Sequence, residues 1–418
     1  MNMKNCKVII GANFGDEGKG LMTDYICSKN KNPIVIRFNS SAQAGHTVTT
    51  KEGKRHIFGH FGSGSLLNIP TYLSKYFSVS PLLFIKEYEE LKNKDIIPKV
   101  YIDINCPIII PYDMIFNQLL EKERGINKHG SCGIGYDESI QRNSIKDYEL
   151  TCKDLISGQY IEKLRKIKNE YVIKRYKELN LKSNNNLINL LYSDDFLYDF
   201  IQDIKDKFLP NVIFSNIIEI FNNYDNFIFE GAQGLMLSED YKYFPHVTHS
   251  KTGSINVLNL LKDNNLFNYF NFEFIYVTRC YFTRHGAGPL PNELKEKPYA
   301  NIIDETNIPN DFQDAIRFAY LNLDILNENI ENDFKKVKEN IPISIFNERV
   351  SKSLAITCIN QANNDHYYYK DGKLINSNDE KFIKDLESYF SMDKYYISTN
   401  PTRENIKIHF KKGVNYVK

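Results

Sequence analysis

The stretch IIGANFGDEGKG, residues 9–20, places two acids and a lysine in a loop that carries four glycines. An apolar run that passes through glycines into a helix offers backbone N–H groups and a favourable dipole to an anion such as phosphate. Asp16 and Glu17 would repel a phosphate, so their presence indicates that the loop does more than bind phosphate. A carboxylate beside a phosphate can hold Mg²⁺, or it can take a proton from the group that accepts the phosphate.

This first loop is not a Walker A motif. The leading glycine of G-x-x-x-x-G-K-[ST] would fall at Asn13, and the metal-binding hydroxyl would fall at Gly20. A glycine loop alone is a weak sign of nucleotide binding, so the rest of the chain must supply the other parts of a site.

Three more polar, glycine-marked segments follow apolar runs. They are NSSAQAGHTV at 39–48 with Gln43, Gly45 and His46, FEGAQGLML at 229–237 with Gln233, and TRHGAGPLPNEL at 283–294 with Arg284 and His285. The carboxyl ends of parallel strands meet at one edge of a sheet, where α/β proteins bind their ligands. Four such loops therefore predict one convergent site.

The elements that must position these loops are short apolar runs separated by helical stretches. The expected strands are CKVII at 6–10, NPIVIRFNS at 32–40, VYIDI at 100–104, NFIFEGAQG at 226–234, FNFEFIYVTR at 270–279 and SLAITCINQ at 353–361. This alternation predicts an α/β fold with a large, mainly parallel central sheet covered by helices. Helices are expected at 21–29 and 158–179, and YYYKDGKLI at 367–375 predicts a hairpin with an Asp-Gly turn. We expect one domain over residues 1–418, with a helical insertion at about 145–225.

Composition narrows the classes of function. The 418 residues are 42% hydrophobic, enough for a sizeable core, and the net charge of +1 offers no field that would recruit nucleic acid or an anionic membrane. No apolar run approaches the roughly 18 residues of a membrane span, and no signal peptide precedes the first strand. The seven cysteines are scattered without a C-x-x-C pair, which predicts reduced thiols in a cytoplasmic protein.

Taken together, these segments resemble the adenylosuccinate synthetase family. The family's W-G-D-E-G-K-G-K is similar to FGDEGKG at 14–20, its N-A-G-H-T to QAGHT at 43–47, its E-G-A-Q-G to 230–234 and its V-T-S-S-N to VTHSK at 247–251. Its T-R-V-G-A-G-P-F-P-T-E-L resembles 283–294, and its S-T-G-P-D-R-T-E resembles ISTNPTRE at 397–404. The order and approximate spacing hold over nearly the whole chain. The fold implied is that family's, which is related to P-loop folds.

The resemblance implies a two-step ligation. The γ-phosphate of GTP passes to the 6-oxygen of inosine monophosphate (IMP), and the amino group of L-aspartate then displaces it to give adenylosuccinate. By the same resemblance Asp16 takes the proton from N1 of the purine and ligates Mg²⁺, and the carbonyl of Gly45 completes the metal site. His46 stabilises charge on the transferring phosphoryl group.

Further positions carry over from the family one by one. The nucleoside triphosphate, GTP or ATP, is expected at Gly15, Glu17, Gly18, Lys19, Gly20, Thr47, Asn360, Ser398 and Asn400. The purine monophosphate is expected at Asn13, Gln43, Ser131, Arg142, Gln233 and Thr248. The family sends the arginine matched by Arg142 across a homodimer interface to the neighbour's phosphate, so a homodimer is implied.

The sequence departs from the family where substrates are recognised. The family's aspartate-binding loop, G-A-T-T-G-R-R-R-R-T-G-W, corresponds to DETNIPNDFQDAIRFAYLNLD at 304–324, which holds a single arginine. One guanidinium can grip one carboxylate in bidentate fashion. The expected aspartate-binding residues are Thr306, Asn307, Gln313 and Arg317.

The family's guanine-reading T-K-L-D corresponds to TCIN at 357–360. An aspartate accepts two hydrogen bonds from guanine, whereas Asn360 offers one acceptor and one donor. The substitution predicts a weakened preference for GTP, with ATP as a donor.

Two alternatives remain open. A phage branch of the family resembles this chain in its altered loops and converts deoxyguanylate to the 2-amino analogue of the product, with ATP as donor. Asp16, which that branch replaces with a smaller residue, favours IMP, whereas Gln43 and the altered aspartate loop favour GMP or dGMP. A catalytically silent, nucleotide-binding paralogue is the second alternative, and the presence of both Asp16 and His46 argues against it.

Overall fold

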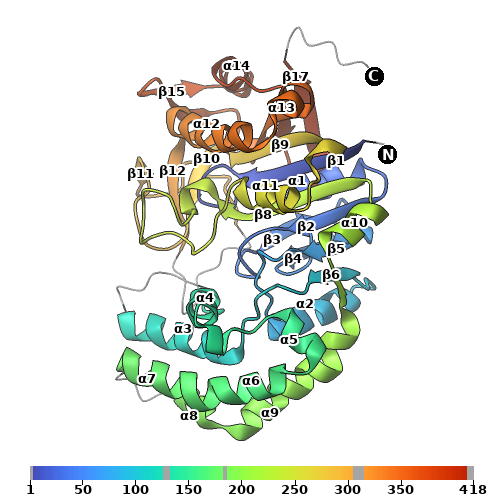
Figure 1. Ribbon diagram of the computed structural model, residues 1–418. Helices are drawn as coiled ribbons and strands as arrows, with labels where there is room; N and C mark the ends of the chain where they lie inside the picture. Colours follow the sequence, from blue (N-terminus) through green and yellow to red (C-terminus); the bar gives the residue numbers. More distant parts are fainter. Residues whose placement is uncertain (1–2, 126–131, 182–185, 305–314, 412–418) are drawn as a thin grey trace.

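A large α/β sheet forms the centre of the protein (Figure 1). The computed structural model describes residues 3–125, 132–181, 186–304 and 315–411. Within these residues ten strands pair in the order β17-β16-β13-β9-β1-β8-β2-β5-β6-β7, and every neighbouring pair is parallel except β16 with β17. The strands are β1 (Lys4–Gly11), β2 (Pro33–Arg37), β5 (Thr71–Leu73), β6 (Val100–Asp103), β7 (Ile213–Ser215), β8 (Asn226–Gly234), β9 (Phe270–Arg279), β13 (Val350–Thr357), β16 (Lys394–Ser398) and β17 (Ile406–Phe410).

Helices cover both faces of this sheet, which is why its central strands are mostly apolar and mostly buried. Helix α1 (Lys19–Ser28) packs Met22 and Ile26 against Ile9 on one face. On the other face, α11 (Ile255–Asp263) and α12 (Leu323–Asn340) belong to the cluster that contains Val8 and Ile10. Neighbouring residues of β1 thus point into different cores.

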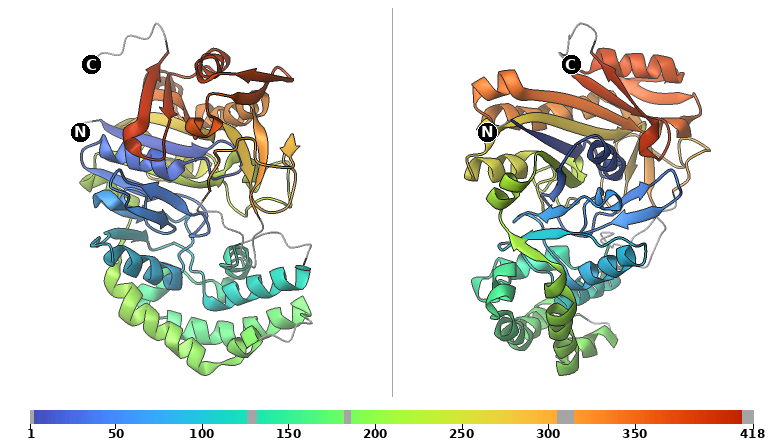
Figure 2. Two further views of the ribbon diagram at one scale, coloured as in Figure 1. Left: turned by 180° about the vertical axis from the view of Figure 1, so that it is seen from behind. Right: turned by 90° about the vertical axis from the view of Figure 1, so that its right-hand side faces the viewer.

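A helical layer lies beyond the β6–β7 side of the sheet, at the bottom of Figure 1 and away from α12 in both views of Figure 2. It has its own buried cluster, which includes Phe116, Leu164 and Phe200. The range 145–225 holds much of this layer, together with β7 and α10. The helices from α2 to α10 are α2 (Pro81–Lys92), α3 (Pro111–Arg124), α4 (Tyr136–Asn143), α5 (Cys152–Ser157), α6 (Tyr160–Lys166), α7 (Ile173–Leu179), α8 (Asn186–Tyr192), α9 (Asp194–Asp203) and α10 (Ile217–Asn223).

Smaller sheets carry the remaining loops. Strands β10, β12, β14 and β15 pair in that order with β11 beside β12, and β3 pairs with β4. The expected hairpin is β14–β15, and its turn residues Asp371 and Gly372 have φ of 52° and 70°. These elements are β3 (His46–Thr49), β4 (Arg55–Phe58), β10 (Tyr281–Arg284), β11 (Glu293–Leu294), β12 (Arg317–Asn322), β14 (His366–Lys370), β15 (Lys373–Ser377), α13 (Ile343–Arg349) and α14 (Asp379–Tyr389).

The predicted α/β class and mainly parallel sheet are therefore confirmed, and each of the six predicted strands is found. The seven cysteines are free thiols. Over the described ranges, no helix is both long and apolar enough to cross a membrane.

Candidate active site

The first loop, between β1 and α1, is organised by Glu17. Its Oε1 accepts hydrogen bonds from the backbone N–H groups of Asn13 at 3.0 Å and Gly15 at 2.8 Å, and its Oε2 accepts one from Lys19 Nζ at 2.9 Å. The Glu17 side chain is only 3% exposed. A Cβ on Gly11 would lie 2.4 Å from Glu17 Oε2, so glycine is required there. This acid therefore holds the loop from inside.

Asp16 points the other way, into a cavity. It has a left-handed backbone, with φ of 60°, and its carbonyl accepts a hydrogen bond from Arg279 Nε. Its Oδ2 lies 3.2 Å from His285 Nε2. Burial raises the pKa of the Asp16 carboxyl, but the hydrogen bond and charge of His285, with the charges of Arg279 and Lys19, outweigh burial and lower the pKa to about 2. Asp16 is therefore an ionised carboxylate at neutral pH.

His46 begins β3, and Glu230 on β8 orients its ring. The His46 Nδ1 lies 2.7 Å from Glu230 Oε1, and the Ser63 backbone N–H donates to Glu230 Oε2 at 3.0 Å. Burial lowers the pKa of His46 to about 4, against the opposing effect of Glu230. The neutral ring therefore donates Nδ1–H to Glu230, and its buried Nε2 has no hydrogen-bond partner among the described residues.

The first loop and the His46 segment meet at a cavity of about 120 Å³. A Cβ on Gly20 would lie 2.9 Å from the Thr47 carbonyl, so the two segments touch. Two of the four loops expected to form one site, the first loop and 39–48, therefore meet at this cavity. The lining residues are Asp16, Gly18, Lys19, Gly20, Gly45, His46, Thr47, Arg279 and Asp304.

Sequence reasoning missed Arg279 and Asp304, whose side chains lie 3.7 Å apart at this cavity. Arg279 is the last residue of β9, a strand that ends at the same sheet edge as β1. A charged residue at the carboxyl end of an apolar parallel strand was the signal that could have found it.

Of the residues expected to bind the purine monophosphate, Asn13 belongs to the first loop and Gln233 lies against it. Gln43 Nε2 donates to Thr248 Oγ1 at 3.1 Å, so these two residues are in contact. Gln233 has φ of 63° and lies against Gly15, whose added Cβ would be 3.4 Å from Gln233 Oε1. Asn13 Nδ2 donates to Thr278 Oγ1 at 2.9 Å.

The segment expected to read the nucleotide base lies beside the same loop. Thr357 Oγ1, at the end of β13, donates to the Glu17 carbonyl at 2.7 Å, and Asn360 is exposed three residues further on. Ser398 ends the neighbouring parallel strand β16, and its Oγ donates to the Asn400 carbonyl at 2.8 Å. All four positions therefore belong to the carboxyl edge of the sheet.

Arg142 differs from its expected role. Its Nε and Nη2 each donate to one oxygen of Asp113 at 2.9 Å, and Nη2 also donates to the Ile108 carbonyl at 2.7 Å. Nη1 donates to Asn143 Oδ1 and the Tyr148 carbonyl, and the side chain is fully buried. A guanidinium bound in this way within its own chain has no exposed donor for a neighbour's phosphate, so the geometry argues against that assignment.

Arg317 also has partners already. Its Nε donates to Glu293 Oε1 at 2.7 Å, its Nη2 binds the second Glu293 oxygen, and Nη1 donates to the carbonyls of Gly286 and Gly288 at 2.9 Å. A bound aspartate would have to displace Glu293 from this fork. The other expected residues of the aspartate loop, Thr306, Asn307 and Gln313, lie outside the described residues, as does Ser131.

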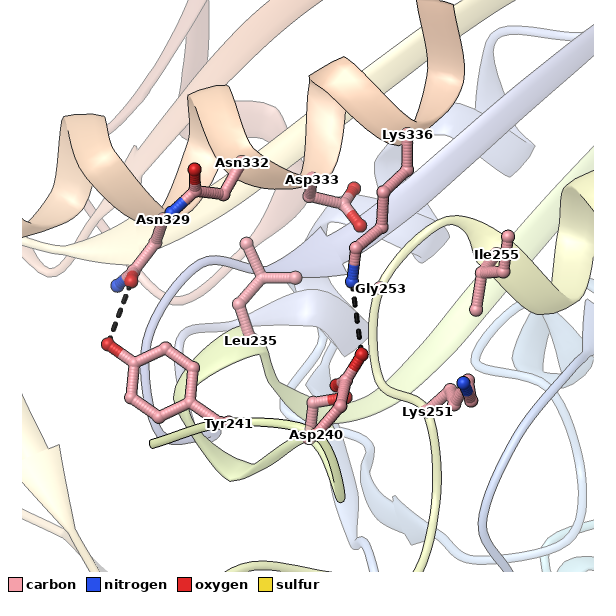
Figure 3. Close-up of a pocket in the computed structure, with 11 residues that line it drawn as sticks. Leu235, Asp240, Tyr241, Lys251, Gly253, Ile255, Asn329, Asn332, Asp333 and Lys336 are labelled. Atoms are coloured by element: carbon pink, nitrogen blue, oxygen red, sulfur yellow. Dashed lines mark hydrogen bonds and ion pairs between the residues drawn. The ribbon is translucent and has the colours of Figure 1, made fainter. Parts of the chain in front are cut away.

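A second cavity, of about 170 Å³, lies between α12 and the segment 235–255 (Figure 3). Asn329 on α12 donates to the Ala12 carbonyl at 3.4 Å and accepts from Tyr241 at 3.0 Å. Asp333 accepts from Tyr276 at 2.9 Å and from the Ser254 backbone N–H at 3.0 Å. These bonds tie α12 to the segments that carry the site, so this cavity has a supporting role.

The donors around Asp16 suit Mg²⁺. Within the described residues no group of three or more His, Cys, Asp or Glu side chains is placed to hold a metal. Mg²⁺, however, usually takes one or two carboxylates together with substrate phosphates and water. Asp16, Asp304 and Gly45 line one cavity, so two carboxylates and a main-chain carbonyl are at hand.

An α/β sheet with a glycine-rich loop at its carboxyl edge is an architecture that binds phosphate-bearing ligands. The model of the adenylosuccinate synthetase family matches residues 8–312. The chain belongs to this family, as the sequence motifs indicated.

Curated relatives agree with this assignment. The adenylosuccinate synthetase of Borrelia duttonii (strain Ly) is 32% identical over 303 residues, which cover 68% of this chain and 64% of that protein. The enzyme of Buchnera aphidicola from Schizaphis graminum is 31% identical over 296 residues, with 69% and 65% covered. The chain thus spans just under two thirds of the length of these relatives.

Two solved structures share the fold. Fully ligated adenylosuccinate synthetase from Plasmodium falciparum has a TM-score of 0.70 at 19% identity, with 96% of this chain and 99% of that chain covered. Succinoaminodeoxyadenylate synthetase of cyanophage S-2L, bound to dGMP and dATP as an energy donor, has a TM-score of 0.59 at 12% identity, with 98% and 96% covered.

Proposed function

We propose that this protein is an adenylosuccinate synthetase, a carbon–nitrogen ligase that joins L-aspartate to C6 of IMP through a 6-phosphoryl intermediate. The supporting observation is the convergence of Asp16, Lys19 and His46 on one cavity. Family membership supports the reaction class, and the retained acid and imidazole support activity over silent binding. The free cysteines fit a cytoplasmic enzyme of purine biosynthesis.

In the first step Asp16 acts on the purine. Its carboxylate is ionised, so it can accept the N1 proton and leave negative charge on the 6-oxygen. That oxygen then forms a bond to the γ-phosphorus as the bond to the nucleoside diphosphate breaks. Lys19 and the glycine amides hold the phosphates in place for this transfer.

In the second step the amino group of aspartate attacks C6, and the phosphate leaves with the C6–O bond electrons. The amine loses one proton, which the departing phosphate takes up to leave as hydrogen phosphate. His46 donates from Nε2 to the transferring group once the bound phosphates have raised the affinity of the ring for a proton. Glu230 keeps the ring oriented throughout, because Nδ1 remains bonded to it.

Mg²⁺ supplies positive charge that offsets the phosphate oxygens when it is bound. Asp16 and the Gly45 carbonyl would hold it. We propose Asn360 as the residue that weakens the preference for GTP over ATP. A homodimer as the working form is proposed from the family resemblance alone, because Arg142 is bound within its own chain. Aspartate would bind at Arg317 after exchange with Glu293, together with Thr306, Asn307 and Gln313.

Product mass separates this function from its alternatives. The full chain is incubated with Mg²⁺, L-aspartate, one of IMP, GMP or dGMP, and either GTP or ATP. The proposal predicts adenylosuccinate from IMP. Asp16→Asn should lower its rate of formation by a factor of about 100 to 10,000, the usual contribution of a general base.

Other results decide against the proposal. Product from GMP or dGMP alone would assign the chain to the chemistry of the cyanophage enzyme, and no product from any mixture would leave a silent nucleotide binder. An Asp16→Asn variant as fast as the parent would show that this carboxylate does not take the proton. Glu90→Asn, at an exposed ion pair on α2, is the matched control and should keep the parent rate.

A further inference from the structure

We propose that Arg279 is a further catalytic residue, whose guanidinium stabilises the phosphoryl group during its transfer from the nucleoside triphosphate to the 6-oxygen. This inference rests on the proposed function, because it requires the phosphoryl group to pass through the cavity that Asp16 and His46 line. The feature that carries it is the position of Arg279 in the wall of that same cavity.

The sheet places Arg279 next to the phosphate-binding loop. Arg279 is the last residue of β9, and β9 lies between β1 and β13 in the strand order. The first loop follows β1, and the segment expected to read the base follows β13. Arg279 lines the cavity together with Gly18, Lys19 and Gly20, the first-loop residues proposed to hold the phosphates. Its guanidinium therefore shares one space with the phosphate-binding groups.

The guanidinium is held in place before any ligand binds. Its Nε donates to the Asp16 carbonyl, and its Nη1 donates to Tyr281 Oη at 3.2 Å. Tyr281 Oη in turn donates to Gln361 Oε1 at 2.5 Å, which orients the hydroxyl to accept from Arg279. The Arg279 side chain is only 13% exposed. A donor fixed in this way stabilises charge without reorganisation at the moment of reaction.

The two cations of the cavity differ in how closely an acid pairs with them. Lys19 Nζ lies 2.9 Å from Glu17 Oε2, within hydrogen-bond distance. Arg279 Nη2 lies 3.7 Å from Asp304 Oδ2, beyond that distance. A guanidinium stays protonated in proteins. A phosphate oxygen can therefore replace Asp304 beside Nη2 and form a charge-assisted hydrogen bond there.

The transfer step explains what this guanidinium does. The 6-oxygen forms a bond to the γ-phosphorus while the bond from that phosphorus to the nucleoside diphosphate breaks, and the electron pair of the broken bond stays on the diphosphate oxygen. Negative charge spreads over the three oxygens of the phosphoryl group. Arg279 Nη2 donates a hydrogen bond to one of them and keeps its proton, so no proton moves in this contact. Such a bond lowers the barrier when it is stronger in the transition state than in the bound triphosphate.

Steady-state kinetics of the full chain test this role with Mg²⁺, IMP, L-aspartate and either GTP or ATP. Arg279→Met keeps the apolar stem and removes the charge, and we expect kcat to fall by a factor of about 100 to 1,000, the usual effect of losing one such donor. The KM for IMP should change by less than about threefold, because the contact forms in the transition state. Arg279→Lys, which keeps the charge without the planar fork, should recover part of kcat.

Arg175→Met on α7 is the matched control. Arg175 is 12% exposed and donates to both oxygens of Glu138 at 2.8 and 3.0 Å, away from the cavity. It should keep the parent's kcat per folded molecule, and thermal unfolding of each variant gives the folded fraction.

A mimic of the phosphoryl group tests the same contact without turnover. Aluminium fluoride takes the place of the transferring group beside a nucleoside diphosphate. Isothermal titration calorimetry with Mg²⁺ and IMP gives the dissociation constants of GDP and ADP with and without aluminium fluoride. We expect aluminium fluoride to tighten the parent's binding of at least one diphosphate by about tenfold or more. Arg279→Met should lose most of this gain and bind the diphosphate alone as the parent does.

Three results would overturn the inference: the parent's kcat in Arg279→Met, a parent that gains no affinity from aluminium fluoride, or an Arg279→Met variant that keeps the full gain. Equal losses of affinity with and without aluminium fluoride would also overturn it, because they would show that Arg279 only supports the loop at Asp16. Failure of the proposed function is separate, since a chain that forms no adenylosuccinate still reports the gain from aluminium fluoride.

Discussion

At the residue scale, the neighbouring acids Asp16 and Glu17 have different roles in the first loop. Glu17 is turned inward and binds Asn13, Gly15 and Lys19, so its charge is satisfied by the loop itself. Asp16 is turned outward because its backbone is left-handed, and it lines the cavity. A phosphate at this loop would therefore contact the backbone amides and Lys19. The charge of Glu17 is already satisfied within the loop, and Asp16 is available to act on a substrate.

His46 gives a prediction for stability against pH. Its pKa in the folded protein, about 4, is below the unfolded value of 6.5, so the folded state binds fewer protons than the unfolded state between these two pH values. The stability that it contributes is complete above pH 6.5 and is lost as pH falls towards 4. In urea unfolding from pH 7.5 to 4.5, His46→Gln should flatten the fall in unfolding free energy by up to about 1.4 kcal/mol per pH unit.

The control for this experiment is His409→Gln, which removes a surface imidazole. The comparison between His46→Gln and the parent reports on His46 together with Glu230, whose pKa His46 helps to lower against the effect of burial. His60 and His366 also have lowered pKa values through burial, but they stay in both proteins. Identical slopes for His46→Gln and the parent would contradict a buried neutral imidazole.

At the scale of elements, the site lies at the carboxyl ends of several strands, and hydrogen bonds connect the segments that follow them. β1, β8, β9 and β13 are adjacent parallel strands, so the residues after them share one edge. Thr357 ties the end of β13 to the Glu17 carbonyl at 2.7 Å, and Met236 N donates to the Asn13 carbonyl at 2.7 Å. The first loop is therefore fixed from two neighbouring segments.

Thr357→Val tests this connection. Valine keeps the shape but cannot donate, so the Glu17 carbonyl loses a buried partner, and we expect a loss of about 1–3 kcal/mol in unfolding free energy. Thr23→Val on α1 is the matched control, because the Thr23 hydroxyl is buried without a partner among the described residues. That control should be neutral or stabilising in urea unfolding. If Thr357→Val and Thr23→Val lost the same unfolding free energy, the hydrogen bond from Thr357 to Glu17 would not stabilise the protein.

At the scale of the whole molecule, the helical layer packs on the central sheet through a buried cluster that includes Leu73 of β5 and Ile102 of β6. Arg142 on α4 binds Asp113 on α3, and both side chains are fully buried. Asp113 Oδ2 also accepts the Ile110 N–H at the start of α3. This buried ion pair joins α3 to α4, so Arg142, which was expected to bind a substrate, instead holds two helices of the layer together.

Arg142→Gln should therefore act on folding. It leaves the Asp113 carboxylate buried without its charge partner, at a cost of about 3–5 kcal/mol in unfolding free energy measured with urea. Arg349→Gln, which breaks a bond to the Asn268 carbonyl at 3.0 Å, is the control and should cost much less. If Arg142 instead bound a neighbour's phosphate, the variant would raise the KM for the purine nucleotide and leave the urea midpoint where it was.

Much of the fold could be predicted because strands and turns leave local patterns of residue type in the sequence. Runs such as residues 6–10 and 270–279 are mostly apolar since both faces of a parallel strand are buried, and Asp371-Gly372 marks a turn that needs positive φ. The glycine-marked loops after these runs likewise predicted that Asp16, Lys19 and His46 would meet.

The sequence by itself therefore determined the fold class, the family and the loops that form the site. Only the tertiary structure decided which partner each charged group has: Glu17 within its loop, Arg142 on Asp113, and His285 on Asp16. The physical reason is that strand and turn patterns depend on neighbours in the chain, whereas the partner of a charge depends on which distant segment folding brings within about 3 Å. Asp16 and His285 are far apart in sequence, and they meet because β1 and β9 are neighbours in the sheet.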